Sequence, residues 1–586
     1  MQLDKYFEEE KIVQILCKYR AKEAGKRHDL HMVRNFSIHE RSNNIYSSQQ
    51  KDLFIQISEM FPSRRKWKKL YRNERKLCTN SLKTNQLRLF NSYKKTKKDI
   101  ELNIIQPPIW YNKLISFAEE IQTEILNIES LKYDLSPPKI TGIKKDEKAG
   151  KITYRPIAVY DLKSKIICSI TAKYFIRFFD KHFLDCSYAF RAYNAERKKI
   201  PSHHDCIDKI AEKRKKSKGL WVAECDIQKF FDIVNHNHLL EVFNKIAKEI
   251  EEVSKKTIDP KSVILFKSFL KSYSFQNNII KLNNNLEWFK ENNLPVGVFG
   301  WAEKELNDEF GDTYCNDNLL GVPQGNAISC FVANLILHDV DEKVFSAVKD
   351  IFYIRYCDDM ILLHNEKLNC QLALEAFTAS LKTNFLLHHL PIENVNYKND
   401  SQYFWNESKS KLPYCWADKN ILNTNIPWLS FVGYQINFDG KIRVRKKTII
   451  KEVKKQVSET EKIIINLGKL KHYQKVRNDN SRWSKRQIIS SLEHRLISMS
   501  VGRIKIYNHK SPLEQGLCWT NGFKTLKRNR IVSRQLRYLD QKRNHQIVRL
   551  NNSLKDIIKK SNIKEFKERK NYNGSAYSYY NFLKYK

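Results

Sequence analysis

Apolar runs in the middle of the chain alternate with short polar breaks that carry acidic residues. Residues 351–355 (IFYIR) and 360–363 (MILL) are rich in strand-forming side chains, and Asp358 and Asp359 lie between them. This pattern predicts a strand–turn–strand hairpin with both carboxylates at its turn. An ordinary Asp-Asp turn is one interpretation, because aspartate favours turns. The other is a metal site, because two adjacent carboxylates repel each other and a divalent cation such as Mg²⁺ relieves that repulsion.

A second apolar run lies upstream of this hairpin. Residues 220–225 (LWVAEC) predict a strand that ends at Asp226, which makes this acid a candidate third metal ligand. The main-chain carbonyl of Ile227 is a candidate fourth oxygen ligand. Asp232 follows shortly afterwards, and we expect it to cap or hydrogen-bond a helix that begins near residues 235–238.

A glycine-containing loop lies between the two acidic segments. Residues 321–329 (GVPQGNAIS) lead into an amphipathic helical pattern at residues 331–337. Such a loop, followed directly by a helix, offers main-chain N–H groups and a flexible surface against which a nucleotide and a template base can lie. By itself this loop is weak evidence for any function.

In this order the three segments resemble motifs A, B and C of reverse transcriptases, and further segments resemble other motifs of that family. YRPIAVY at 154–160 with SKII at 164–167 is similar to the fingers motif, SYAFR at 187–191 to the motif after it, LPIENVNYK at 390–398 to motif D, and LSFVGY at 429–434 to the primer-grip hairpin. The resemblance extends over roughly residues 135 to 445. It implies an RNA-directed DNA polymerase, a nucleotidyltransferase that adds dNTPs by two-metal phosphoryl transfer.

The resemblance also implies roles for single residues. Asp226, Asp358 and Asp359 would hold two Mg²⁺ ions, with Mn²⁺ as an alternative metal. The implied nucleotide-binding residues are Arg155 at the triphosphate, Phe231 as a steric gate against a ribose 2′-hydroxyl, Gln324 and Gly325 on the template–primer side, and Lys398 as a proton donor near the β and γ phosphates. Gly433 would contact nucleic acid at the primer grip. Lys382 is an alternative to Lys398, and burial of both Phe230 and Phe231 in the core is the alternative to a gate.

The implied fold is α+β, a right-hand polymerase with fingers, an antiparallel palm sheet and a helical thumb. The expected domains are a helical basic extension at 1–134, fingers at 135–219, a palm at 220–445 with an insertion at about 240–318, and a helical thumb with a C-terminal tail at 446–586. Trp288 and Trp301 would pack the insertion onto the palm, unless this segment is an ordinary spacer helix with a longer loop.

Among reverse transcriptases the chain most resembles the bacterial antiphage and abortive-infection groups, because it has a long N-terminal extension and no ribonuclease H or endonuclease motif. A retron-like or group II intron-like enzyme without an endonuclease is an alternative, although residues 194–197 (NAER) depart from the retron signature. Template-independent or protein-primed synthesis is another, with the tyrosines at 572–585 as candidate primers. A dedicated non-coding RNA, a partner protein or a homo-oligomer is compatible with the defence interpretation.

Composition agrees with a partner made of nucleic acid. The chain has 105 Lys plus Arg against 65 Asp plus Glu, which gives a net charge of +40, and such a field favours a phosphate polymer. We expect no membrane association, because no apolar run reaches about 18 residues and the first residues do not form a signal peptide. Its 12 cysteines lack a CxxC pair, which indicates reduced thiols in a cytoplasmic protein.

The positive charge is concentrated in one early segment. Residues 63–98 contain fourteen Lys or Arg and a single acid, Glu74, with aromatic side chains between them. The candidate nucleic-acid-binding residues are Arg64, Arg65, Lys66, Lys68, Lys69 and Arg72, and the interleaved aromatics are Trp67, Tyr71, Phe90 and Tyr93. Basic side chains with aromatics suit a surface that binds phosphates and stacks bases. A solvated helix face is the alternative.

Overall fold

The chain combines many helices with three small sheets and divides into two compact units. The computed structural model describes residues 2–34, 48–76, 78, 81–129, 133–193, 198–217, 219–391, 409–416, 428–468, 485–501, 522–527 and 529–560. Unit 1 comprises Met1–Ile12, Ser116–Val432 and Ile436–Gly440, and unit 2 comprises Val13–Ile115, Gly433–Gln435 and Lys441–Lys586. The predicted mixture of helix and strand is confirmed. Lys398, residues 194–197 and the tyrosine-rich tail lie outside the described residues.

The central sheet of unit 1 has four antiparallel strands in the order β5-β6-β3-β7. Its strands are β3 (Trp221–Glu224), β5 (Phe352–Tyr356), β6 (Asp359–His364) and β7 (Lys411–Cys415). The predicted hairpin is therefore present as β5 and β6, and the predicted upstream strand is β3. Val222 lies opposite Leu363 on one side and Tyr414 on the other, which places β3 inside the sheet.

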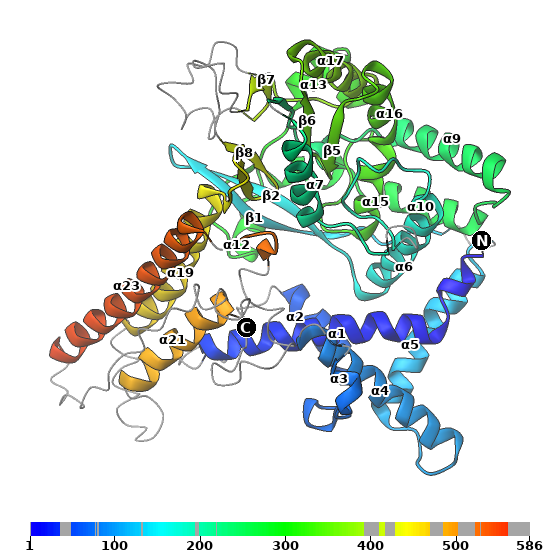
Figure 1. Cartoon of the computed structure of the whole chain (residues 1–586). Coiled ribbons are helices and arrows are strands. Elements are labelled where there is room, and N and C mark those ends of the chain that lie inside the picture. Colours follow the sequence, from blue (N-terminus) through cyan, green and yellow to red (C-terminus); the bar gives the residue numbers. More distant parts are fainter. Residues whose placement is uncertain are drawn as a thin grey trace. The chain divides into compact units, whose positions relative to one another are not determined.

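Helices pack against this sheet (Figure 1), and four helices of unit 1 contribute rings to an aromatic core. The helix α17 (Lys367–Thr383) packs on β3, β6 and β7 and against α16 (His338–Ala347). The aromatic core joins Phe175 of α6 (Leu162–Phe179), Phe243 of α9 (His236–Ser254), Phe266 of α10 (Pro260–Lys271) and Phe331 of α15 (Ala327–Ile336). These rings are fully buried, and buried aromatic pairs add to the stability that area burial alone provides.

A second sheet in unit 1 includes a strand from the insertion. The antiparallel pair β1 (Lys139–Lys148) and β2 (Lys151–Val159) is extended by β4 (Val298–Phe299), which runs parallel to β2. Trp288 contacts Phe299 at 5.6 Å between ring centroids, whereas Trp301 stacks on Phe275 at 4.5 Å. Both of these ring partners lie within residues 240–318, so the expectation that the two tryptophans pack the insertion onto the palm stays a prediction.

Shorter helices complete unit 1. They are η1 (Asp4–Tyr6), α7 (His203–Lys215), α8 (Phe230–Ile233), α11 (Phe275–Asn278), η3 (Ile280–Leu282), α12 (Leu286–Glu291), α13 (Glu303–Phe310) and α14 (Tyr314–Asp317). The helix α5 (Ile109–Leu126) contributes residues to both units.

Unit 2 is mainly helical. Its N-terminal helices are α1 (Glu9–Arg34), which begins in unit 1, α2 (Ser48–Glu59), η2 (Arg64–Lys66), α3 (Arg72–Lys76) and α4 (Ser81–Glu101). Its C-terminal helices are α19 (Lys446–Gly468), α21 (Lys485–Val501) and α23 (Arg530–Lys560) (Figure 1). They share an apolar core that includes Ile463, Leu492 and Leu550. The helical character predicted after residue 446 is confirmed for these segments.

A third sheet of three short strands, in the order β10-β9-β8, corresponds to the predicted hairpin at 429–434. Its strands are β8 (Trp428–Phe431), β9 (Tyr434–Asn437) and β10 (Ile442–Val444). Within the described parts of the chain, no helix has the length and apolar character that crossing a bilayer requires. The cysteines of those parts are free thiols, as predicted.

Candidate active site

Strand pairing brings the three candidate aspartates into one neighbourhood. Asp226 lies two residues beyond the end of β3 and forms an isolated antiparallel bridge with Asp359, the first residue of β6. Asp358 is the preceding residue, in the turn between β5 and β6. The antiparallel register of β3 on β6, in which Ala223 faces Leu362, continues into this bridge. The sequence prediction that two distant acidic segments come together is therefore confirmed.

The turn between β5 and β6, residues 356–359, has an unusual backbone. Tyr356 pairs with Asp359, so Cys357 and Asp358 form a two-residue connection. Cys357 has a φ of 62°, in the left-handed region. Two-residue hairpin turns commonly need a positive φ at their first position, which glycine or asparagine usually supplies. The contacts of Cys357 must therefore hold this conformation, and in doing so they restrain the main chain that leads into Asp358.

The electrostatics of Asp358 favour the arrival of a cation. Burial raises the pKa of Asp358, and the negative charge of Asp226 raises it further, while hydrogen bonds and the charge of Arg155 oppose the increase. A carboxylate under these conditions gains from a positive partner. Carboxylate oxygens are also the ligands that Mg²⁺ prefers, with waters and substrate phosphates at its remaining positions. The donor set therefore fits Mg²⁺.

The side chains are nevertheless not gathered as a ready-made cage. Among the described residues, no group of three or more His, Cys, Asp or Glu side chains stands close enough to hold a metal ion. Mg²⁺ sites of this class take one or two protein carboxylates and complete the shell with substrate phosphates.

Two residues that the sequence interpretation missed lie beside Asp226. Its carboxylate Oδ2 is 3.4 Å from Lys409 Nζ and 3.5 Å from His389 Nε2, and those two nitrogens are 2.7 Å apart. Burial and the charge of Lys409 lower the pKa of His389. The Asp226 amide donates to Ser410 Oγ at 3.1 Å, and the His389 amide donates to the Asp226 carbonyl at 2.9 Å. Two separate segments therefore hold Asp226 by its main chain and its carboxylate.

The remaining candidates near this cluster are placed as follows. Ile227 is buried and bridges His388, and nothing in these contacts bears on its expected role as a metal ligand. Lys382, the alternative proton donor, pairs with Glu309 at 2.7 Å. Lys409 lies two residues before the start of β7, which pairs with β3, and this pairing is the reason that a lysine so distant in sequence reaches Asp226.

Arg155 and Phe231 lie on elements that border the aspartates. Arg155 is an exposed residue of β2. Burial raises the pKa values of both Asp358 and Asp232, and the charge of Arg155 opposes part of that rise. Phe230 is buried, with 2% of its surface exposed, whereas Phe231 is only partly buried. The two rings meet edge to face at 5.0 Å. The alternative in which both rings are core therefore holds for Phe230 and not for Phe231.

The loop that contains Gln324 and Gly325 is fixed by main-chain and side-chain bonds. The Gln324 carbonyl accepts from the Ala158 amide at 3.0 Å, and Gln324 Nε2 donates to Asp232 Oδ1 at 2.7 Å. Gly325 has a φ of +97°, and a Cβ there would lie 3.4 Å from Ile157. This loop therefore lies against β2, the strand that carries Arg155.

Asp232 does not cap the following helix, so that prediction is wrong. The helix begins at His236, as expected, but its cap is Asn235, whose Oδ1 accepts from the amides of Asn237 and His238 at 2.9 and 3.1 Å. Asp232 is buried, and burial raises its pKa to about 6 even though Gln324 and nearby cations lower it. Its observed role is to hold the Gln324 amide.

In unit 2 the basic segment presents charge but few aromatic rings. The basic loop, residues 63–72, exposes Arg64, Arg65, Lys66, Lys69 and Arg72, with Lys68 half-buried. Tyr71 is 70% exposed, but Trp67 and Tyr93 are buried and Phe90 is partly buried. Trp67 lies between the guanidinium groups of Arg20 and Arg88, at 5.3 and 5.9 Å, and donates Nε1 to the Pro62 carbonyl. Base stacking by Trp67 or Tyr93 is therefore excluded, which leaves Tyr71 as the exposed ring of the loop.

Gly433 lies in the turn between β8 and β9 with a φ of +87°. A Cβ at this position would lie 3.6 Å from the Phe523 ring. The conformation favours glycine. Its expected contact with nucleic acid stays a prediction.

Comparison with known proteins gives only distant likenesses. No protein-family model and no curated protein matches the chain. Among solved structures, the chain is similar to apo telomerase from Candida tropicalis, at 13% identity over 76% of this chain and 71% of that chain, with a TM-score of 0.33. It is also similar to telomerase from Candida albicans in complex with a TWJ fragment of telomeric RNA, at 12% identity over 88% and 76% of the two chains, with a TM-score of 0.31.

Proposed function

We propose that this protein is an RNA-directed DNA polymerase, a reverse transcriptase that adds dNTPs to a primer end. The observation that carries the proposal is the bridge between Asp226 and Asp359, with Asp358 in the adjoining turn. These acids come from the segments that resemble motifs A and C. The segment that resembles motif B is bonded to Asp232 and to β2 close by.

The proposed chemistry assigns a task to each of these residues. Asp226, Asp358 and Asp359 would hold Mg²⁺, which when bound supplies charge neutralisation and activation of a hydroxyl for in-line phosphoryl transfer. The primer 3′ hydroxyl loses its proton to solvent water and its oxygen forms a bond to the α-phosphorus, while the bond from that phosphorus to the bridging oxygen of the β-phosphate breaks and pyrophosphate leaves. Arg155 binds the triphosphate, for which a permanently charged planar guanidinium is suited.

A group beside Asp226 would supply the proton that the leaving pyrophosphate takes up. Lys409 and His389 share a hydrogen bond next to this carboxylate, and Lys409 is half-exposed, with 54% of its side chain accessible. A cationic amine at this position can give a proton to departing pyrophosphate, a form of general acid catalysis. We assign to Lys409 the task that the sequence interpretation gave to Lys398.

Phe231 would exclude ribonucleotides. The Phe231 ring is only partly buried, and Phe231 lies five residues after Asp226. Its ring can therefore crowd the 2′-hydroxyl of a bound ribose. An RNA-dependent RNA polymerase is the second candidate, since it would use the same acids, but it would be expected to admit that hydroxyl.

Comparison of dNTP and NTP incorporation by wild type and Phe231→Ala tests this proposal. Purified protein with its co-purifying nucleic acid receives Mg²⁺ and each labelled nucleotide, and an Asp358→Asn, Asp359→Asn double variant serves as the control. We expect dNTP incorporation by wild type, a loss of at least about 10³-fold in the control, and a drop in discrimination against NTPs of about ten-fold or more in Phe231→Ala. Efficient NTP use by wild type would favour the RNA polymerase, and activity in the control would contradict the assignment of the acids.

We further propose that the enzyme serves bacterial defence against phage, with an RNA template, a DNA product and Mg²⁺ as its metal. What supports this setting is the resemblance of the motifs, together with the long region before them and the helices α19, α21 and α23 after them. A dedicated template RNA or a partner protein belongs to the same proposal.

A further inference from the structure

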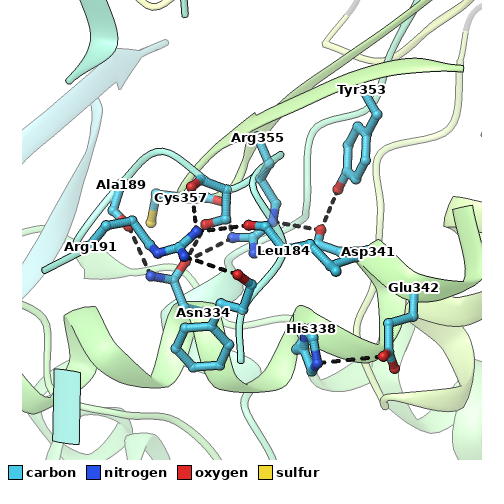
Figure 2. Close-up of polar contacts among 12 residues, drawn as sticks. Leu184, Ala189, Arg191, Asn334, His338, Asp341, Glu342, Tyr353, Arg355 and Cys357 are labelled. Atoms are coloured by element: carbon cyan, nitrogen blue, oxygen red, sulfur yellow. Dashed lines mark hydrogen bonds and ion pairs between the residues drawn. The ribbon is translucent and has the colours of Figure 1, made fainter. Parts of the chain in front are cut away.

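A fully buried arginine, Arg355, donates a hydrogen bond to the turn that carries Asp358. Arg355 is the fourth residue of β5, and its exposed surface is 0%. Its guanidinium makes a two-point ion pair with Asp341 of α16, with Nε 2.9 Å from Oδ1 and Nη2 2.6 Å from Oδ2 (Figure 2). This fork geometry fixes the plane of the guanidinium as well as its position.

The remaining donor of this guanidinium is directed at the turn. Arg355 Nη1 donates to the carbonyl oxygen of Cys357 at 3.1 Å and to Asn334 Oδ1 at 3.3 Å. Cys357 is the residue with φ of 62°, and its carbonyl belongs to the peptide unit that joins it to Asp358. The hydrogen bond therefore restrains the plane of the peptide unit between Cys357 and Asp358.

The groups around the guanidinium are themselves fixed. Tyr353 Oη donates to Asp341 Oδ1 at 2.7 Å, and Ser187 Oγ donates to Asn334 Oδ1 at 2.7 Å. Asn334 Nδ2 donates to the Ala189 carbonyl at 2.8 Å. Figure 2 shows Asn334, Asp341 and Tyr353 around Arg355. Outside β5 itself, the partners come from α15, from α16 and from the loop of Ser187 and Ala189. The position of Arg355 is thus set by three separate segments.

A second buried arginine shows what a purely structural role looks like in this protein. Arg191 pairs with Asp180, and its other N–H groups donate to the carbonyls of Asp180, Phe183, Leu184 and Ser187. All of these acceptors lie within the loop that Arg191 closes. Arg355 differs because one of its bonds reaches the turn of a candidate catalytic residue.

A buried ion pair is seldom retained for stability alone, because apolar residues of the same volume often stabilise a core as well or better. We propose that Arg355 is a positioning residue for the polymerase reaction: anchored by Asp341, it holds the Cys357 carbonyl and so sets the direction of the Asp358 carboxylate. The inference rests on the proposed function to the extent that Asp358 is a catalytic residue. The geometric part, that Arg355 orders the turn, stands apart from it.

The test compares Arg355→Lys with Tyr353→Phe. Lysine keeps the positive charge, but its single nitrogen cannot bond both Asp341 oxygens and the Cys357 carbonyl together. Tyr353→Phe removes one hydrogen bond to the same Asp341 and leaves every bond of Arg355 to the turn in place, so it serves as a matched control for general weakening of the cluster.

Two readouts are measured on each full-length variant. For Arg355→Lys we expect kcat for dNTP addition to fall about ten- to a hundred-fold, with KM for dNTP within about two-fold and a higher Mg²⁺ concentration needed for half-maximal rate, because a misplaced ligand impairs the reaction more than binding. We also expect faster hydrogen exchange in peptides spanning residues 356–360 without metal or nucleotide. Tyr353→Phe should keep wild-type kcat and wild-type exchange in those peptides.

The outcomes separate this inference from the proposed function. Equal kcat and equal exchange in Arg355→Lys and Tyr353→Phe would overturn the positioning role. If wild type incorporates no nucleotide, the proposed function fails and the exchange comparison alone decides whether Arg355 orders the turn. If Arg355→Lys does not fold, Asp341→Asn replaces it, since the amide keeps the volume and one acceptor but releases the fork, and the same two comparisons apply.

Discussion

Single carboxyl groups in the candidate site are tuned by burial in different ways. Asp358 and Asp232 both have raised pKa values, and burial is the main cause for each. Asp358 lies beside a second acid and awaits a cation, whereas Asp232 is occupied by the Gln324 amide. The same physical effect therefore marks one residue as a candidate ligand and the other as a support for the loop of Gln324.

Asp232 gives a prediction about pH and stability. Its folded-state pKa of about 6 is above the usual 3.8, so the unfolded chain releases this proton first as the pH rises. Protonated Asp232 therefore contributes on the order of 3 kcal/mol to the free energy of unfolding at low pH. This contribution is lost as the pH rises from about 4 to about 6, and it stays lost at higher pH. Asp232→Asn has no such proton to lose, and its amide oxygen still accepts from Gln324.

Urea unfolding in EDTA at pH 4.5 and pH 7.5 checks this prediction. The stability of Asp232→Asn relative to wild type should increase between the two pH values, by up to about the 3 kcal/mol given above. All other titrating groups are shared by the two proteins and cancel in the comparison. A difference that does not change with pH would mean that burial does not shift this carboxyl.

At the scale of elements, the sequence predicted the strands that local hydrophobic patterns determine, but not the contacts that depend on distant segments. Alternating apolar runs predicted β3, β5 and β6 and the meeting of their acids, because strand pairing follows the hydrophobic pattern. Lys409 and Ser410 could not be predicted, since Ser410 is 184 residues away from Asp226 in sequence and both residues approach it only because β7 pairs with β3. Trp67 was one of the aromatics expected on a base-stacking surface, yet it is buried, and its ring lies near the guanidinium groups of Arg20 in α1 and Arg88 in α4.

The basic loop at residues 63–72 yields a prediction at this scale. Replacing its exposed Arg64, Arg65, Lys69 and Arg72 by alanine should weaken binding to single-stranded RNA and flatten the dependence of log K on log salt, by up to about 0.7 for each lost phosphate contact. The free energy of unfolding should change by less than about 0.5 kcal/mol for each substitution, because these side chains are exposed. Fluorescence anisotropy at several salt concentrations measures the affinity for RNA and its dependence on salt.

A matched control removes the same amount of charge elsewhere. Lys248, Lys256, Lys267 and Lys290 are also exposed, and their replacement by alanine leaves the net charge equal to that of the loop variant. If the control lowers affinity and salt dependence as much as the loop variant does, the loop is not a specific contact surface.

At the scale of the whole molecule, the charge of +40 is the dominant feature. Such a field attracts a phosphate polymer from any direction, and it raises affinity without selecting a sequence. Under the proposed function, selection of the product would come from the site around Asp226, where base pairing with a template would decide which nucleotide is joined. This division predicts that general binding and templated synthesis can be separated by experiment.

Single-nucleotide addition on a defined RNA template annealed to a DNA primer tests the central claim most directly. Wild type with Mg²⁺ is given one dNTP at a time, alongside Asp226→Asn, which should still bind the duplex. We predict extension by one nucleotide only with the dNTP complementary to the next template base, and none with Asp226→Asn. Extension that ignores the template, equal extension by the variant, or none by a wild-type protein that binds the duplex would contradict the assignment of this chain as an RNA-directed DNA polymerase.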